Sequence, residues 1–203
     1  MARHLLCHAT QSAKVTPDAI EFSCLQHGKP IVQAPPEAAQ PFNIAHTDGL
    51  VLCGIAPQHH LQLGVDVERL DRRTDTELAA RYFSAPEVEY VFSFSNETCR
   101  HHAFLKVWTL KEAFIKAIGT GLHTPLANFA FENIDSTSPT IRMLSPELES
   151  NLNWRFFSCY PRDSFIAAIA VAANQDEAAV SMELHDFDSF VHQNSASSDP
   201  KGP

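Results

Sequence analysis

Residues 61–68, which read LQLGVDVE, carry the clearest structural pattern in the sequence. Apolar residues at positions 63, 65 and 67 alternate with small or acidic residues at 64, 66 and 68, and this period of two is that of a half-buried β-strand. The second face of the predicted strand carries Asp66 and Glu68. Because these residues lie two apart, both carboxylates project from that face, about 7 Å apart along the chain.

A long helix is predicted downstream of this strand. From about residue 99 to residue 118, apolar side chains form a stripe at helical spacing, and glycines at 119 and 121 end it. Along this helix Trp108, Glu112 and Lys116 follow one another at i, i+4 spacing, which puts a carboxylate and an ammonium on one side and one turn apart. If the helix packs on the strand, three carboxylates converge beside a lysine.

Such a carboxylate cluster has two interpretations. Hard oxygen ligands at this spacing suit Mg²⁺, which keeps several waters and completes its shell with substrate phosphates, as a site that cleaves a diphosphate requires. However, an Asp-x-Glu at a strand end is most often a solvated edge, and a pair such as Glu112 and Lys116 is most often a surface pair on a helix. Spacing alone leaves both interpretations open.

The remaining segments predict further short elements. Ser84 and Glu87 have the spacing of a capping box, so a helix is expected from Ala85 to about Phe92. A helix is expected at Ala2–Ala13, and strands are expected at Ile20–Cys24, Phe42–His46, Leu50–Ala56, Phe129–Phe131, Ile141–Met143, Trp154–Tyr160, Phe165–Ala173 and, most weakly, Val180–Leu184. Because the later connections are too short for crossover helices, the strands are expected to be antiparallel and the fold class α+β.

Composition excludes several classes of protein. The net charge of −9, from 24 acidic and 15 basic residues, argues against a nucleic-acid binder. No apolar run approaches the roughly 18 residues of a membrane span, and no signal peptide is expected. The five cysteines show no C-x-x-C pairing, which favours a reducing cytoplasm. Paired histidines such as His59-His60 are expected at the surface, because no Cys or carboxylate completes a tetrahedral metal site.

Two of these stretches together are similar to the two-part signature of the 4′-phosphopantetheinyl transferases, in the surfactin-synthetase-type class. They are residues 64–68, GVDVE, and residues 108–116, WTLKEAFIK. Further segments resemble the family in order and spacing: GKP at 28–30, FNIAHT at 42–47, RYFS at 81–84 with Glu87, and GTGL at 119–122. Several ordered segments that match together make coincidence improbable, although each alone is weak evidence.

The resemblance implies a fold and an activity. The fold is a pseudo-dimer of two similar α+β halves, expected here at residues 1–62 and 63–185, with residues 186–203 as a disordered tail. The activity is transfer of 4′-phosphopantetheine from coenzyme A to a serine of an acyl, peptidyl or polyketide carrier protein, with release of 3′,5′-ADP. The protein is expected to be a monomer.

The resemblance also implies roles for individual residues. Asp66, Glu68 and Glu112 would bind Mg²⁺ or Mn²⁺. Glu112, or a metal-bound water, would accept the proton of the carrier serine, and Lys116 would stabilise the departing phosphate. The residues expected to bind coenzyme A are Lys29, His46, Arg3 and Lys111, with Arg69 as a further contributor to the positive field.

The sequence departs from the family pattern in two places. Ala45 stands where the family usually has a serine, which removes a hydroxyl, and only Arg3 is expected to stand in for an arginine-rich stretch that helps to hold coenzyme A. Two other functions therefore stay open. One is a degenerate relative that binds a carrier or coenzyme A without catalysis, and the other is an unrelated metal-dependent phosphohydrolase.

Overall fold

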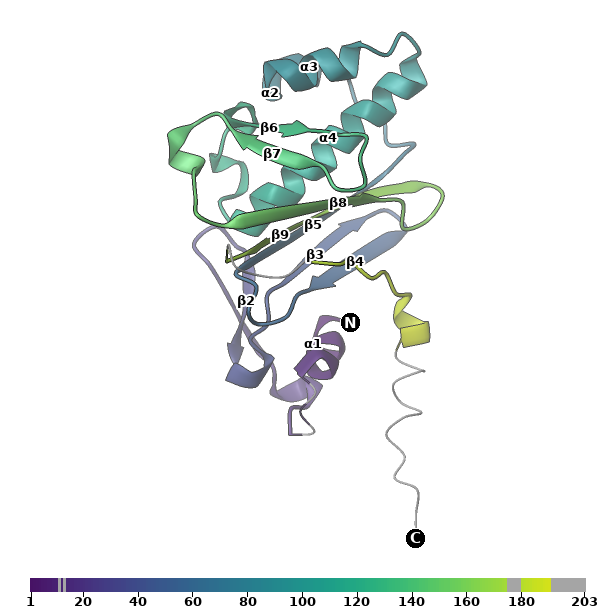
Figure 1. Cartoon of the computed structure of the whole chain (residues 1–203). Coiled ribbons are helices and arrows are strands. Elements are labelled where there is room, and N and C mark those ends of the chain that lie inside the picture. Colours follow the sequence, from purple (N-terminus) through teal and green to yellow (C-terminus); the bar gives the residue numbers. More distant parts are fainter. Residues whose placement is uncertain (11, 13, 175–179, 191–203) are drawn as a thin grey trace.

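The computed structural model describes residues 1–10, 12, 14–174 and 180–190, and it has the predicted α+β fold with antiparallel strand pairing (Figure 1). The helices are α1 (Ala2–Thr10), α2 (Leu78–Tyr82), α3 (Ala85–Phe92) and α4 (Glu97–Ile118). The strands are β1 (Glu21–Cys24), β2 (Pro30–Ala34), β3 (Phe42–Thr47), β4 (Leu50–Ile55), β5 (Gln62–Arg69), β6 (Phe129–Glu132), β7 (Thr140–Met143), β8 (Asn153–Cys159) and β9 (Phe165–Ala173). Of the predicted tail, only residues 186–190 are described.

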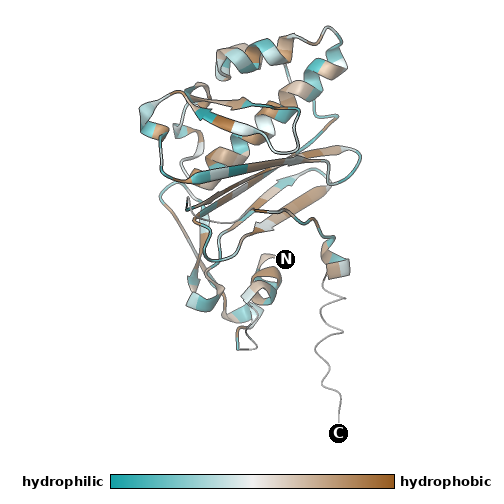
Figure 2. Cartoon of the chain, viewed as in Figure 1, coloured by the Kyte–Doolittle hydropathy of each residue, from teal (hydrophilic) through white to brown (hydrophobic). Residues whose placement is uncertain are grey.

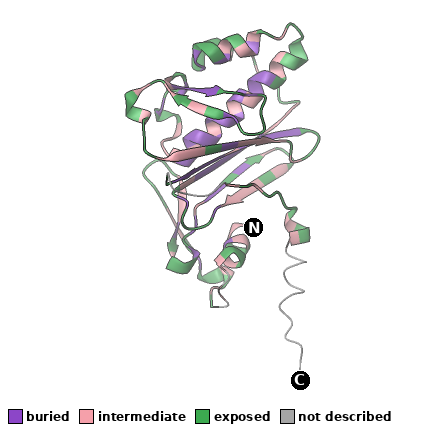
Figure 3. Cartoon of the chain, viewed as in Figure 1, coloured by how far each residue is buried: buried purple, intermediate pink, exposed green. Residues whose placement is uncertain are grey.

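The centre of the molecule is a three-stranded sheet with strand order β5-β9-β8. Ile169 of β9 pairs with Val65 of β5 on one side and with Phe157 of β8 on the other. Figure 2 shows apolar residues concentrated in this central sheet, and Figure 3 shows β5 and β9 largely buried, whereas β8 is mostly half-buried. One face of the sheet packs against α4, which contributes Phe104 and Phe114 to the largest apolar cluster.

The hairpin of β3 and β4 covers the other face of this sheet. Ala45 of β3 packs with Val65 and Val67 of β5 in a second apolar cluster. The hairpin comes close because residue 54 is glycine: a Cβ there would lie 2.7 Å from Cγ1 of Val65. The backbone N–H of Val65 also donates to Oδ1 of Asn43 over 2.9 Å. Helix, sheet and hairpin therefore form three layers, with β5 in contact with both outer ones.

The order of elements repeats along the chain, in agreement with the predicted two-half fold. The series α1, hairpin β1–β2 and hairpin β3–β4 is followed later by α4, hairpin β6–β7 and hairpin β8–β9. β5 precedes the second series and joins its sheet by pairing with β9. The boundary near residue 62 stays a prediction.

Most of the predicted elements are confirmed, and the capping box at the start of α3 is among them. Ser84 and Glu87 make the reciprocal bonds of that motif, so α3 has the predicted bounds. The predicted strand at Val180–Leu184 is wrong, because these residues take part in no strand pairing. Their alternating pattern suits a strand, but a strand also needs a partner backbone. Within the described part of the chain, no helix has the length and hydropathy to span a bilayer.

Candidate active site

Strand β5 and helix α4 touch through their backbones at Gly64. A Cβ on this residue would lie 2.1 Å from the carbonyl oxygen of Ala113 and 2.4 Å from the amide nitrogen of Ala117. Glycine therefore allows α4 to lie directly on the strand, where any other residue would push it away. This close approach brings Glu112 and Lys116 of the helix to the acidic face of β5.

Asp66 is the most buried carboxylate of the cluster, with 6 % of its surface exposed. Its Oδ1 accepts a hydrogen bond from Nζ of Lys116 over 2.6 Å, and the two side chains form an ion pair. Burial raises the pKa of Asp66, and the charge of Lys116 opposes that shift. Oδ2 of Asp66 is also buried and has no hydrogen-bond partner among the described residues.

Glu68 lies two residues further along the same face and is paired with Arg72. The guanidinium of Arg72 also lies over the ring of Trp108, 5.8 Å from its centroid. Burial raises the pKa of Glu68, the charge of Arg72 opposes the shift, and the charge of Asp66 adds to it. The two carboxylates therefore interact, and each has a cation beside it.

Glu112 of α4 completes the cluster. Burial raises its pKa from 4.5 to about 6, and the charge of Asp66 is the next largest cause. Lys116 opposes the shift, and Glu68 adds to it. Since charges at short range are needed for such effects, the structure brings all three predicted carboxylates and Lys116 together.

The cluster fits a divalent cation in its chemistry. Three carboxylates whose charges repel one another, with an unpartnered buried oxygen on Asp66, are the donor set that a hard cation prefers. As the described side chains stand, no three of the His, Cys, Asp and Glu type are grouped closely enough to hold an ion. Lys116 and Arg72 pair with Asp66 and Glu68 instead, so the three carboxylates could hold a cation only after these side chains rearranged.

Lys29 does not stand free at the site. Its ammonium donates to the carbonyl oxygen of Leu63, over 3.0 Å, and to that of Ala117. Burial lowers the pKa of Lys29 to about 8. The side chain thus ties the turn before β2 to the start of β5 and to the last turn of α4, where it also satisfies a terminal carbonyl.

The other residues predicted to bind coenzyme A have different surroundings. His46 is exposed on β3, opposite Val51 of β4. Arg3 is exposed on α1, with its guanidinium 5.4 Å from the centroid of the Phe22 ring. Arg69 pairs with Asp71 and with Asp48. The first two side chains are accessible to a ligand, whereas Arg69 is held by exposed carboxylates.

Lys111 is separated from the carboxylate cluster because its side chain is fully buried on another side of α4. Its ammonium lies 2.8 Å from Oε2 of Glu87 and donates to the carbonyl oxygens of Leu126 and Phe129. Oε1 of Glu87 accepts a hydrogen bond from the N–H of Phe131. This network joins α3, α4 and β6, and it leaves Lys111 no path to coenzyme A.

Sequence reasoning missed Arg72 as a member of the site. The only available signal was its position four residues after Glu68, and no element was predicted there from which its direction could be inferred. The structure shows that the chain turns back after β5, which carries the guanidinium to Glu68 and Trp108. Trp108 itself was placed on the correct side of the helix by its i, i+4 spacing.

Comparisons with known proteins agree with this arrangement. Residues 62–170, which include β5, α4 and most of β9, match the family model of the 4′-phosphopantetheinyl transferase superfamily. The chain is 32% identical over 161 residues to the 4′-phosphopantetheinyl transferase HetI of Nostoc sp., covering 78% of this chain and 63% of HetI. It is 28% identical over 173 residues to a 4′-phosphopantetheinyl transferase of Bacillus subtilis, covering 83% of this chain and 70% of that protein.

The chain also resembles a solved structure of a holo-(acyl-carrier-protein) synthase from Bacillus anthracis in complex with CoA (3′,5′-ADP). The superposition has a TM-score of 0.47 at 17% identity, and it covers 57% of this chain and 98% of that one. The chain thus spans less than two thirds of the length of HetI, although its signature segments lie within the matched region. As the signature at residues 64–68 and 108–116 predicted, the chain belongs to the 4′-phosphopantetheinyl transferase superfamily.

Proposed function

We propose that this protein transfers 4′-phosphopantetheine from coenzyme A to a serine of an acyl, peptidyl or polyketide carrier protein, with release of 3′,5′-ADP. One observation carries the proposal: Glu112 and Lys116 of α4 meet the acidic face of β5. The names of the relatives, which are 4′-phosphopantetheinyl transferases, support it. We also propose that the protein acts as a monomer in the cytoplasm, in keeping with five cysteines that are all free thiols.

Asp66, Glu68 and Glu112 would hold Mg²⁺, and Mn²⁺ would suit the same oxygen ligands. When bound, the cation would neutralise the diphosphate of coenzyme A and stabilise the charge that develops during transfer. The unpartnered Oδ2 of Asp66 supports this assignment, because a buried carboxylate oxygen costs free energy until a donor or a cation satisfies it.

Glu112 would also act as the proton acceptor for the serine hydroxyl. In the metal-free site burial raises its pKa to about 6, so at neutral pH it is mainly ionised and able to accept a proton. A base with these properties promotes attack of the serine oxygen on the β-phosphorus, which breaks the bond to the 3′,5′-ADP oxygen.

Lys116 would exchange one anionic partner for another during the reaction. Its ammonium pairs with Asp66 in the ligand-free protein, and it lies one turn from Glu112 on the same side of α4. With a cation held by Asp66, the ammonium of Lys116 would be free to bind the departing phosphate of 3′,5′-ADP. For the rest of coenzyme A we propose His46 and Arg3, which are exposed, and Lys29 through its partly buried ammonium.

Binding of a carrier or coenzyme A without transfer is a second candidate function. The ion pairs of Asp66 with Lys116 and of Glu68 with Arg72 favour it, since they occupy two of the three proposed metal ligands. Intact-mass analysis of an apo carrier protein, incubated with the chain, coenzyme A and Mg²⁺, separates the two functions. A gain of one phosphopantetheine group that requires metal establishes transfer.

A matched pair of variants assigns that transfer to the cluster. Glu112→Gln keeps the size of the side chain and removes the charge, and the same change at the exposed Glu89 of α3 is the control. Loss of transfer in Glu112→Gln alone is the expected result. No gain in carrier mass, together with direct binding of carrier or coenzyme A, would favour the non-catalytic function instead.

A further inference from the structure

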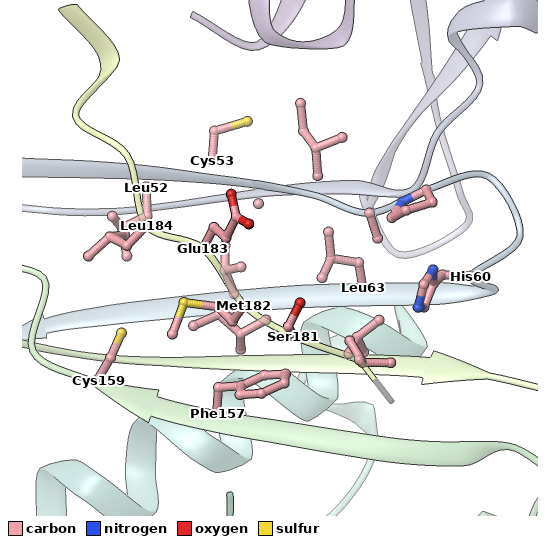
Figure 4. A pocket seen from close by; sticks show the side chains of 18 of the residues that line it. Leu52, Cys53, His60, Leu63, Phe157, Cys159, Ser181, Met182, Glu183 and Leu184 are labelled. Atoms are coloured by element: carbon pink, nitrogen blue, oxygen red, sulfur yellow. The ribbon is translucent and has the colours of Figure 1, made fainter. Parts of the chain in front are cut away.

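A cavity of about 430 Å³ lies beside β4, on the face of the central sheet that α4 does not cover. Figure 4 shows it between β4 and the strands below, with residues 181–184 running across it. Most of its wall is apolar, and the apolar side chains that line it include Leu63, Val65, Phe157, Ile169, Val171 and Met182.

The cavity is separate from the carboxylate cluster because strand side chains alternate between the faces of a sheet. Leu63 and Val65 of β5 point into the cavity, whereas Gly64 and Asp66 face α4. A ligand in the cavity would therefore be divided from the cluster by the thickness of the sheet, and the proposed transfer function does not account for this space.

One end of the cavity carries a buried polar side chain without a partner. His60 is only 8 % exposed, and neither Nδ1 nor Nε2 has a hydrogen-bond partner among the described residues. Its ring packs against that of His59 with 4.4 Å between centroids, and Figure 4 shows it at one end of the cavity. The expectation of a surface histidine is therefore wrong for His60. Buried polar atoms nearly always have a hydrogen-bond partner. We therefore expect a polar group inside the cavity to bind one of these nitrogens.

The rest of the lining limits what that polar group can be. Among the residues that the structure describes, no lysine or arginine lines the cavity, so neither an ammonium nor a guanidinium is available there for a phosphate or a sulfate. Cys53 and Cys159 are neutral thiols there, because burial raises the pKa of both, that of Cys53 to about 11. Glu183 is exposed and pairs with His185 at the rim. A ligand would thus meet the buried His60 and its neighbour His59 at one end, Ser181 and Glu183 on the segment that crosses the cavity, and mainly apolar side chains elsewhere.

The strand that borders the cavity offers a long edge to a ligand. The stretch of β4 and its exit that lines it, Leu52 to Ala56, extends roughly 13 Å at the rise of a β-strand, which is about the length of a medium alkyl chain. The volume of about 430 Å³ lies within the size range of small-molecule sites.

We propose that this cavity binds an unbranched aliphatic carboxylic acid of medium length, with its carboxylate hydrogen-bonded to a ring N–H of His60 and its chain along β4. A single carboxylate is the small anionic group that one imidazole can satisfy, and the alkyl chain matches the apolar wall.

Isothermal titration calorimetry of decanoic acid with the full chain tests the proposal. The acid is kept below its micelle concentration. Decanol and decyl phosphate are the comparison ligands. Decanoic acid is expected to bind once per chain and more tightly than either. His60→Phe keeps an aromatic ring and removes both nitrogens. It should therefore lower the affinity for decanoic acid by about tenfold or more and leave the affinity for decanol unchanged. His123→Phe, at an exposed histidine outside the cavity, is the matched control.

A second readout uses the unaltered protein and so does not depend on how a variant folds. Saturating decanoic acid should slow the reaction of a maleimide with Cys53 and Cys159, which line the cavity, and leave the exposed Cys99 of α4 unaffected. Equal affinity for decanol and decanoic acid, no weakening by His60→Phe, or unchanged labelling at both lining cysteines would each overturn the proposal. None of these outcomes depends on phosphopantetheinyl transfer.

Discussion

Nζ of Lys116 lies 2.6 Å from Oδ1 of Asp66, across the contact between α4 and β5. The pair joins the last third of the helix to the middle of the strand, and it places a positive charge where the proposed metal would bind. In the ligand-free protein the most buried carboxylate of the cluster is thus paired with a lysine. The same contact has consequences for stability, for metal binding and for the geometry of catalysis.

Replacement of Lys116 should make the protein depend on a cation for stability. Lys116→Met leaves the Asp66 carboxylate buried without its partner, so the free energy of unfolding is expected to fall by about 1–3 kcal/mol without metal. Addition of Mg²⁺ with coenzyme A should restore part of the loss. Urea unfolding with and without these ligands measures both effects, and an unchanged midpoint in the metal-free variant would contradict this role of the ion pair.

Gly64→Ala should separate β5 from α4. The new Cβ would overlap the backbone of Ala113 and Ala117, so a loss of about 2–3 kcal/mol in stability is expected. Because catalytic groups must be placed to within a fraction of an ångström, transfer should fall by roughly 100-fold in the folded variant. The control is Val91→Ala, which would create a cavity in the core at α3 and so lower stability without moving the site. This variant should keep normal transfer. Normal transfer by folded Gly64→Ala would count against the close contact.

The stability of the metal-free protein should fall as pH rises through the pKa of Glu112. This pKa is raised from 4.5 to about 6 in the folded state, so the contribution of Glu112 is fully present below pH 4.5 and is lost above about pH 6. Relative to Glu112→Gln, the unaltered protein should lose about 1–2 kcal/mol across that window, after allowance for solvent screening. Urea unfolding in EDTA at several pH values measures the difference, which should shrink in saturating Mg²⁺. Parallel pH curves for the two proteins would refute the assignment.

Lys111 is expected to contribute to the stability of the fold and not to the binding of coenzyme A. Lys111→Met leaves Glu87 charged in the core without its partner, which is expected to cost about 3–5 kcal/mol of stability. The double variant with Glu87→Leu should recover part of this cost. The KM for coenzyme A should stay the same in whichever variant folds, and a large rise in that KM would return Lys111 to the coenzyme A site.

Much of the site could be predicted because its residues lie on regular elements. The period of β5 placed Asp66 and Glu68 on one face, and the period of α4 placed Glu112 and Lys116 on one side. The direction of Lys111 could not be predicted, because its burial depends on Glu87, which is distant in sequence. The direction of Lys29 could not be predicted either, because its acceptors are the carbonyl oxygens of Leu63 and Ala117, which are also distant in sequence. The error at Val180–Leu184 has the same origin, as a local pattern does not supply a partner strand.

We propose above that Asp66, Glu68 and Glu112 form one divalent cation site. Electron paramagnetic resonance of Mn²⁺, titrated with the protein in the presence of coenzyme A, measures occupation of this site without needing turnover. The unaltered protein and Glu89→Gln should bind one Mn²⁺ per chain, and Asp66→Asn, Glu68→Gln and Glu112→Gln should each bind it at least about tenfold more weakly. Unchanged Mn²⁺ affinity in all three variants would show that these carboxylates do not form the cation site.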